Sequence, residues 1–217
     1  MRPFLVQFYE RRREVRRYVA VLVRAERELD SAGSRRHHRE LSVLRAAAIL
    51  LLYNTVEAAA RAGIQSIYDE IELTDTSLDE LCEPLRRRVL RDFRSNATDR
   101  DIDAVVTAAK EMAALSFDPR RIFGGNVDAR ELRSQSSDYG FTIDADGRRT
   151  KMGEDLVTIK RKRNDLAHGV TSFSEVGRDY TAKQIREMAF RSLGYMEAML
   201  TSIDQYLTSR KFRAPGV

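Results

Sequence analysis

Apolar residues recur every three, four or seven positions near the N-terminus of the chain. They form one stripe among many charged positions, which is the pattern of an amphipathic surface helix. We predict a helix over residues 4–29, with Gly33 as its stop. Its apolar stripe consists of Phe8, Val15, Val19, Leu22 and Leu29.

The next segment is apolar on almost every side. We predict a second helix over residues 39–62 that ends near Gly63. Its middle, RAAAILLLYNTVEAAARA, has no wide polar face, which places this helix at the centre of a bundle. Asn54 and Glu57 lie three apart on it, and a buried polar group without a partner is costly. We therefore expect each of them to have a hydrogen-bond partner.

The middle of the chain carries several helix-capping signals. Ser77 and Glu80 form a capping-box pattern that opens a helix to about Arg94, and Pro84 either kinks this helix or delays its start. Thr98 is then a cap for a helix over residues 99–115. These short helices are expected to pack around the central one.

An irregular segment, about 116–150, follows these helices. Within it, Asn126 is the expected cap of a short helix over residues 127–137. Residues 139–150 alternate briefly around Phe141 and Ile143 and contain the turn dipeptide Asp146-Gly147, which indicates a small hairpin.

Regular helical patterns return in the last third of the chain. The segment 154–167 reads as a helix that Gly169 ends, and Thr181 with Gln184 opens a final helix to about Leu207. The expected fold is all-α, a bundle of about five to seven helices. We predict a single domain over 1–217, with a short basic tail at about 208–217.

Composition agrees with a helical globular protein. The 217 residues are 42% hydrophobic and 33% charged, with few prolines, enough to bury a real core. The single cysteine, Cys82, excludes an intramolecular disulfide and suits a reducing compartment, so we expect a cytoplasmic protein in which Cys82 is a packing residue. No leader and no run of roughly 18 apolar residues is apparent, so no contact with a membrane is expected.

The charge balance is basic but modest. The chain has 38 basic and 33 acidic residues, a formal net charge of +5, and most of the basic residues are arginines. Arginine suits phosphate partners because its guanidinium binds two oxygens at once. Ordinary solubility explains the same excess, so the charge alone leaves nucleic-acid binding open.

The segment IKRKRNDLAHGV holds the strongest candidate site. Asn164 and His168, four apart on the predicted helix, share a face, whereas Arg163 lies about 140° round from His168. Two interpretations remain open from the residues alone. His168 caps the last carbonyls of the helix beside a solvated basic face, or it moves protons at a site where Arg163 binds an anion.

Other candidate chemistry is weak. The adjacent His37 and His38 point apart and lack acidic or cysteine partners, so no metal is expected there. Gly124 and Gly125 lack the lysine and the strand of a phosphate-binding loop, and indicate a helix-entry turn. No nucleophile triad and no metal cluster is apparent, so no cofactor is expected.

Three stretches resemble one protein family. RNDLAH matches the arginine, polar residue, three variable residues, histidine motif of the HEPN superfamily, whose members are small helical bundles. LLLYNTVEAA and GGNVDARELRSQSSDYGF look like segments of a toxin-like HEPN subfamily found in bacterial defence loci. Together the three stretches lie within residues 40–217, in the order that the family has.

The resemblance implies a metal-independent endoribonuclease that acts as a homodimer, with two motif helices lining a cleft at the two-fold axis. The RNA 2′-OH would attack the adjacent phosphate and leave a 2′,3′-cyclic phosphate. RNA brings its own nucleophile, in keeping with the absence of a triad. The catalytic residues would be Arg163 and His168, supported by Asn164, Glu57 and Asn54, with Lys160, Arg161 and Lys162 binding RNA.

The resemblance leaves the biological role and some residue roles open. Glu57 either makes a structural bond between helices or pairs with Arg163 to shape the cleft. A toxin or antiviral effector with an antitoxin or defence-protein partner is expected, although Val170 stands where related toxins controlled by a nucleotidyltransferase carry a tyrosine. The alternative is a non-catalytic HEPN module that binds nucleic acid or a nucleotide, or a helical interaction subunit.

Overall fold

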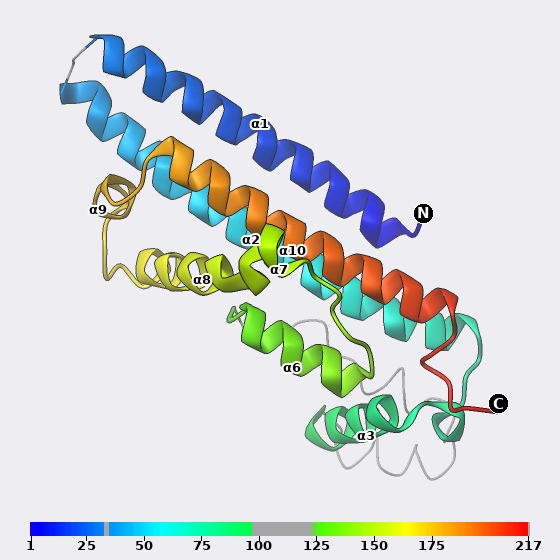
Figure 1. Cartoon of the computed structure of the whole chain (residues 1–217). Coiled ribbons are helices and arrows are strands. Elements are labelled where there is room, and N and C mark those ends of the chain that lie inside the picture. The colour runs from blue at the N-terminus through cyan, green and yellow to red at the C-terminus, as the bar shows by residue number, and fades with distance from the viewer. Residues whose placement is uncertain (33–34, 97–122, 124, 217) are drawn as a thin grey trace.

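Three long helices run side by side and form the frame of the protein (Figure 1). The computed structural model describes residues 1–32, 35–96, 123 and 125–216. The frame consists of α1 (Pro3–Ala32), α2 (Arg35–Leu73) and α10 (Ala182–Thr208). The predicted helix over 99–115 and the stop at Gly33 lie outside the described residues.

The second helix is longer than its sequence pattern indicates. Gly63 was expected to end it, but α2 continues for about ten more residues to Leu73. A Cβ atom at Gly63 would lie 2.8 Å from Leu200 Cδ2 and 2.9 Å from Ile203 Cδ1, both on α10. The expected helix end is therefore wrong, because this glycine lets α10 approach α2 closely.

The shorter helices lie along one side of this frame (Figure 1). The 3₁₀ turn η1 (Leu78–Glu80) precedes α3 (Glu83–Asn96), so the capping box at Ser77 opens η1 and Pro84 does delay the helix. Next come α6 (Ala129–Tyr139), α7 (Gly147–Thr150), η2 (Lys151–Gly153), α8 (Glu154–Ala167) and α9 (Phe173–Arg178). The all-α prediction is confirmed.

Two expectations for the irregular segment are wrong. The cap of α6 is Asp128, whose carboxylate accepts from Arg130 N and Glu131 N, and not Asn126. In place of a hairpin near 139–150, residues 141–146 form an irregular link to α7. Asp146 caps α7 by accepting from Arg148 N, so its pairing with Gly147 starts a helix rather than a β-turn.

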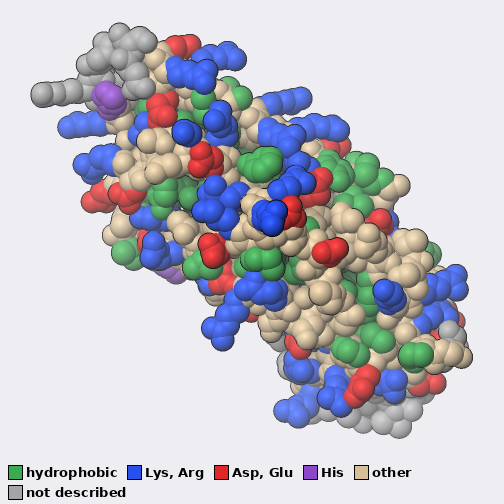
Figure 2. Space-filling view, viewed as in Figure 1, with side chains coloured by type: hydrophobic (Ala, Val, Ile, Leu, Met, Phe, Trp, Pro, Cys, Tyr) green, Lys and Arg blue, Asp and Glu red, His purple; other side chains and the backbone are tan. Residues whose placement is uncertain are grey.

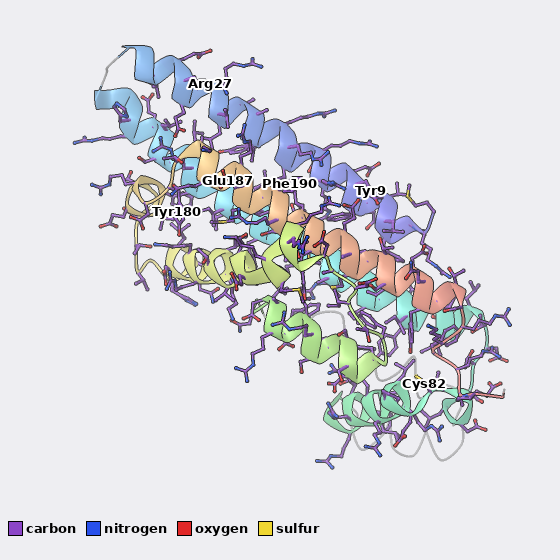
Figure 3. The ribbon with its side chains drawn as sticks, viewed as in Figure 1. Tyr9, Arg27, Cys82, Tyr180, Glu187 and Phe190 are labelled. Atoms are coloured by element: carbon purple, nitrogen blue, oxygen red, sulfur yellow. The ribbon has the colours of Figure 1, made fainter. Side chains whose placement is uncertain are left out.

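The C-terminal residues are packed rather than free. Phe212 is fully buried, and its carbonyl accepts a hydrogen bond from Cys82 N at 2.8 Å. Cys82 is half-buried, with its Sγ 3.4 Å from Tyr206 Oη, close to the C-terminus (Figure 3). The predicted tail at 208–217 therefore covers the start of α3, and Cys82 is the expected packing residue.

Helix α2 also bears on the expectation that the protein makes no contact with a membrane. Among the described residues, its part His38–Leu73 is long and apolar enough to cross one, with a mean hydropathy of 1.4. This property rests on length and composition alone, and the absence of membrane contact stays a prediction. Half of the apolar window is buried inside the structure, as in the core helix of a soluble protein.

Helix α9 lies very close to helix α2. A Cβ atom on Gly177 of α9 would lie 1.7 Å from the carbonyl oxygen of Ser42 on α2. The backbones themselves are therefore in contact, and no side chain fits between them. Sequence patterns missed α9, although Ser172 and Glu175 form a capping box at its start.

Gly177→Ala should therefore destabilise the protein by about 3 kcal/mol or more, because α9 has to move away from α2. Gly194→Ala is the matched control, since a Cβ there meets only Thr150 Cγ2 at 3.6 Å, an ordinary contact. The control should be neutral or slightly stabilising. Urea unfolding measures both, and equal stability of the two variants would refute the close contact.

Candidate functional site

The motif helix α8 is anchored at its N-terminal end. Arg191 of α10 binds the Asp155 carboxylate with two hydrogen bonds, of 2.5 Å and 3.1 Å. Leu156 and Ile159 are buried beneath the helix. At the other end, Gly169 has φ +67° and stops the helix, as its sequence predicts. The three motif residues Arg163, Asn164 and His168 thus lie at the C-terminal end of a fixed helix.

Arg163 lies over an aromatic ring of the central helix. Its guanidinium carbon is 4.7 Å from the centroid of the Tyr53 ring, a cation–π contact. Its Nη1 donates a hydrogen bond of 2.9 Å to Asn164 Oδ1. On another side, a Cβ atom on Gly125 would be 3.1 Å from the same Nη1. Three stretches far apart in the sequence therefore meet at one guanidinium.

No described carboxylate forms an ion pair with Arg163. This distinguishes it from its basic neighbours: Lys160 pairs with Asp128, and Lys162 pairs with Asp179 at 2.8 Å. Lys162 also lies 5.8 Å from the centre of the Tyr180 ring, which Figure 3 shows between α9 and α8. Arg163 is half-buried, and among the described residues no carboxylate compensates its positive charge.

Tyr53 is a fully buried residue that sequence reasoning did not single out. Its hydroxyl accepts a hydrogen bond of 3.3 Å from Val127 N. Burial raises the pKa of Tyr53, and the negative charge of Glu57 raises it further. The phenol therefore stays neutral and joins the central helix to the turn before α6. The signal available in the sequence was an aromatic residue within an apolar run, which is common in any core.

Glu57 is one turn further along α2 and makes its ion pair on that helix. Its Oε1 accepts from Arg61 Nη2 at 2.9 Å, an i,i+4 pair. The observed ion pair is therefore neither of the two alternatives for Glu57, a bond between helices or a pairing with Arg163. The charges of Glu57 and Arg163 both act on Tyr53 and shift its pKa in opposite directions.

Asn54, the other supporting residue predicted on the central helix, lies on the side of that helix that is open to solvent. Asn54 is exposed, so the expectation that this amide is buried is wrong. The residues one turn before and after it, Leu51 and Ala58, are also partly exposed. The central helix is therefore covered on most sides but not all, and Asn54 needs no partner because water reaches it.

His168 is exposed at the C-terminal end of α8. It is the C-cap residue, and its backbone N–H donates 2.9 Å to the carbonyl of Asn164. No described residue forms a hydrogen bond or an ion pair with its imidazole. Asn164, half-buried, lies one turn earlier on the same face and accepts from Arg163. The Asn164 side chain thus contacts the Arg163 guanidinium and shares a face of α8 with His168, although Arg163 and His168 form no direct contact.

The surrounding basic charge is dispersed. Arg161 is exposed and pairs with no described carboxylate, whereas Lys160 and Lys162 are engaged in ion pairs. Figure 2 shows lysines and arginines spread over the visible face with acidic residues among them. Of the three predicted RNA-binding residues, Arg161 is therefore the one free to meet a phosphate without first leaving a partner.

Asp128 joins the cap of α6 to the motif helix. Burial alone raises the pKa of its carboxyl, but the hydrogen bonds from Lys160 and from Glu131 N and Arg130 N outweigh this and hold it below its usual range. A carboxyl with a lowered pKa in the folded state stabilises the protein above its unfolded-state pKa, about 3.9. This contribution is lost as the pH falls through the lower folded-state value.

We therefore expect the wild type to lose stability as the pH falls below about 4, partly through Asp128. Asp128→Asn keeps a good N-cap but loses the ion pair, so it should be less stable at pH 7 and lose less on acidification. Urea unfolding between pH 7 and pH 2.5 measures this. Parallel pH profiles for the two proteins would contradict the assigned role.

Gly125 offers a test of the guanidinium position. It has φ +78°, so an alanine there costs about 1–2 kcal/mol in backbone strain, and its Cβ displaces Arg163. Gly140→Ala is the control, with φ +81° and a Cβ that would meet Cys82 Sγ at 3.2 Å, away from Arg163. Both variants should lose similar stability, but only Gly125→Ala should weaken binding of an RNA oligonucleotide, measured by fluorescence anisotropy. Equal affinities would contradict the contact.

Among the described residues, no three histidine, cysteine, aspartate or glutamate side chains gather as a metal site would require.

Comparison with known proteins gives one family. No curated protein and no solved structure matches the chain. A family model described as MAE_28990-like HEPN matches residues 5–212, nearly the whole chain. The chain therefore belongs to the MAE_28990-like HEPN family.

Proposed function

We propose that this protein is a metal-independent endoribonuclease in which Arg163 binds the scissile phosphate and His168 moves protons. Family membership supports a nucleic-acid-related role. The observation that carries the proposal is the state of Arg163: it is half-buried and stacked on Tyr53, and no described carboxylate neutralises it. A cation held in this way is prepared for an anion, because its charge is both oriented and free.

The reaction needs no nucleophile from the protein. The 2′-OH of the substrate attacks the neighbouring phosphorus, the 5′-oxygen leaves, and the products are a 2′,3′-cyclic phosphate and a 5′-OH end. The planar guanidinium of Arg163 offers paired N–H donors to the phosphate oxygens as negative charge builds. His168 accepts the 2′-OH proton or protonates the leaving oxygen.

A second copy of the chain completes the site in this proposal. Arg163 and His168 are separated around α8 by about 140°, so one helix does not aim both at one phosphate. Val157, which is 50% exposed, Arg161 and His168 follow each other at four- and seven-residue spacings along the open face of α8. In a two-fold dimer through this face, every contact occurs twice, so His168 of each copy approaches Arg163 of the other.

The same proposal covers the biological role. An RNA-cutting homodimer of this family would act on cytoplasmic RNA as a toxin or an antiviral effector, restrained or activated by an antitoxin or a defence-protein partner. Arg161 contributes a phosphate contact outside the reacting centre, and Asn164 orients Arg163 through its 2.9 Å hydrogen bond.

The proposal predicts that the purified protein cleaves labelled single-stranded RNA or tRNA in excess EDTA and leaves 2′,3′-cyclic phosphate ends. His168→Ala should lower the rate about 10²–10⁴-fold through loss of proton transfer, and Arg163→Ala about 10²–10³-fold through loss of charge stabilisation. Arg13→Ala, an exposed arginine on α1, should leave it unchanged. End analysis and single-turnover rates measure these effects.

Three outcomes would contradict the proposal. One is cleavage that stops in EDTA, and another is cleavage by His168→Ala at the wild-type rate. The third is salt-dependent RNA binding by the folded wild type without cleavage, which would indicate a non-catalytic binding module of the same family.

A further inference from the structure

A basic cavity lies between the start of α2 and α9, outside the site described above. Its volume is about 560 Å³, and its lining consists of His38, Arg39, Ser42, Arg45, Ser174 and Arg178. Each of these side chains carries an N–H or O–H donor, and none is a carboxylate. A cavity lined in this way is suited to an anion with several oxygen acceptors.

The lining residues are placed by regular helix spacing. His38, Ser42 and Arg45 follow each other at four- and three-residue steps on one face of α2, and Ser174 and Arg178 lie four apart on α9. The backbone contact of Gly177 with Ser42 fixes the two helices against each other. The donors therefore stand on rigid elements.

Charges around the cavity are only partly compensated. Arg45 pairs with Glu26, but its Nε is buried and has no partner among the described residues. Arg178 Nε donates 3.1 Å to the carbonyl of Ser174, which holds the guanidinium over α9. His38 and Arg39 are exposed and pair with no described carboxylate.

Glu175, the acidic residue of α9, caps the start of that helix. Glu175 accepts a hydrogen bond of 2.7 Å from Ser172 N in the capping box, which uses its carboxylate at the start of the helix. Arg178 also lies near enough to this carboxylate to help lower its pKa, so Glu175 offsets part of the Arg178 charge, whereas Arg39 pairs with no described carboxylate.

The cavity is close to the catalytic helix along the chain. His168 and Ser174 are six positions apart in the sequence, so their Cα atoms are at most about 20 Å apart. The ion pair of Lys162 with Asp179, 2.8 Å, joins α8 to the end of α9. A nucleic-acid strand with a rise of about 3.4 Å per nucleotide covers this distance in about six nucleotides.

We propose that this cavity binds a backbone phosphate of the RNA, up to about six nucleotides from the cleaved bond. The inference rests on the proposed ribonuclease function, which supplies the strand. Arg39 and Arg178 provide the charge, and the Ser174 hydroxyl and His38 provide further donors, whereas the Ser42 hydroxyl already donates to the carbonyl of His38. The phosphate of a free nucleotide has the same chemistry, so the test separates the two sources.

Binding is measured first, with a twelve-nucleotide RNA that carries 2′-O-methyl groups and so has no nucleophile. The double variant Arg39→Gln/Arg178→Gln should bind it about tenfold more weakly, and the slope of log affinity against log salt should fall by about 1.4 for two lost contacts to a single strand. The control is Arg13→Gln/Arg17→Gln, which removes two exposed arginines of α1. Equal affinities for the two double variants would overturn the proposal.

Cleavage kinetics give the second readout. With a twelve-nucleotide RNA, the Arg39→Gln/Arg178→Gln variant should show a raised KM and a nearly unchanged kcat. With a dinucleotide, which is too short to reach the cavity, it should match the wild type. An equal rise of KM for both substrates would overturn the assignment of a distant phosphate.

Competition with 5′-AMP and with inorganic phosphate identifies the source of the phosphate. Weak competition by both supports the RNA strand, whereas displacement of the RNA by micromolar 5′-AMP, lost in the double variant, would assign the cavity to a free nucleotide instead. The two proposals fail separately. Wild-type cleavage without a binding difference between the double variants refutes the cavity alone, and a binding difference without wild-type cleavage refutes the ribonuclease alone.

Discussion

The contact between Arg163 and the Tyr53 ring is the interaction on which the candidate site depends. A guanidinium 4.7 Å above a buried ring is held in one place without losing its charge to a carboxylate. Other described arginines that lie between helices are neutralised, as Arg191 is by Asp155 and Arg12 by Glu197 at 2.6 Å. The aromatic contact positions Arg163 while leaving it able to bind an anion.

This contact requires the long central helix to be continuous and well packed. Tyr53 is fully buried because α1, α8 and α10 all contact α2. The N-terminal end of α10 is fixed by Glu26 of α1, whose carboxylate accepts from Ala182 N at 2.9 Å and also binds Arg45. The frame of α1, α2 and α10 thus supports the motif helix α8 from one side. His168, at the C-terminal end of α8, is exposed to solvent.

Sequence reasoning succeeded where the signal is local. The ends of α8 and α10 follow from Gly169 and from the capping box of Thr181 with Gln184, because caps act within one turn. It failed where a distant contact decides. Gly63 resembles a helix end, yet it is a contact point for α10, and the Asp146-Gly147 pair resembles a hairpin turn, yet it opens α7.

In the candidate site too, the local features followed from the sequence and the distant contacts did not. Arg163 and His168 stood out by the motif, but no spacing rule indicates that Tyr53 and Gly125 meet Arg163, because these residues are 110 and 38 positions away. The exposure of Asn54 was equally hidden, since it depends on which side of α2 the other helices leave open. Long-range packing, rather than local propensity, therefore sets the chemistry of the site.

The most direct measurement mixes two inactive proteins, Arg163→Ala and His168→Ala, lets their subunits exchange, and assays RNA cleavage. If arginine and histidine come from opposite copies, each mixed dimer has one intact site, and random exchange should restore about a quarter of wild-type activity. No recovery, with exchange confirmed by differently tagged subunits, would contradict a shared site and place both residues in one chain or outside catalysis.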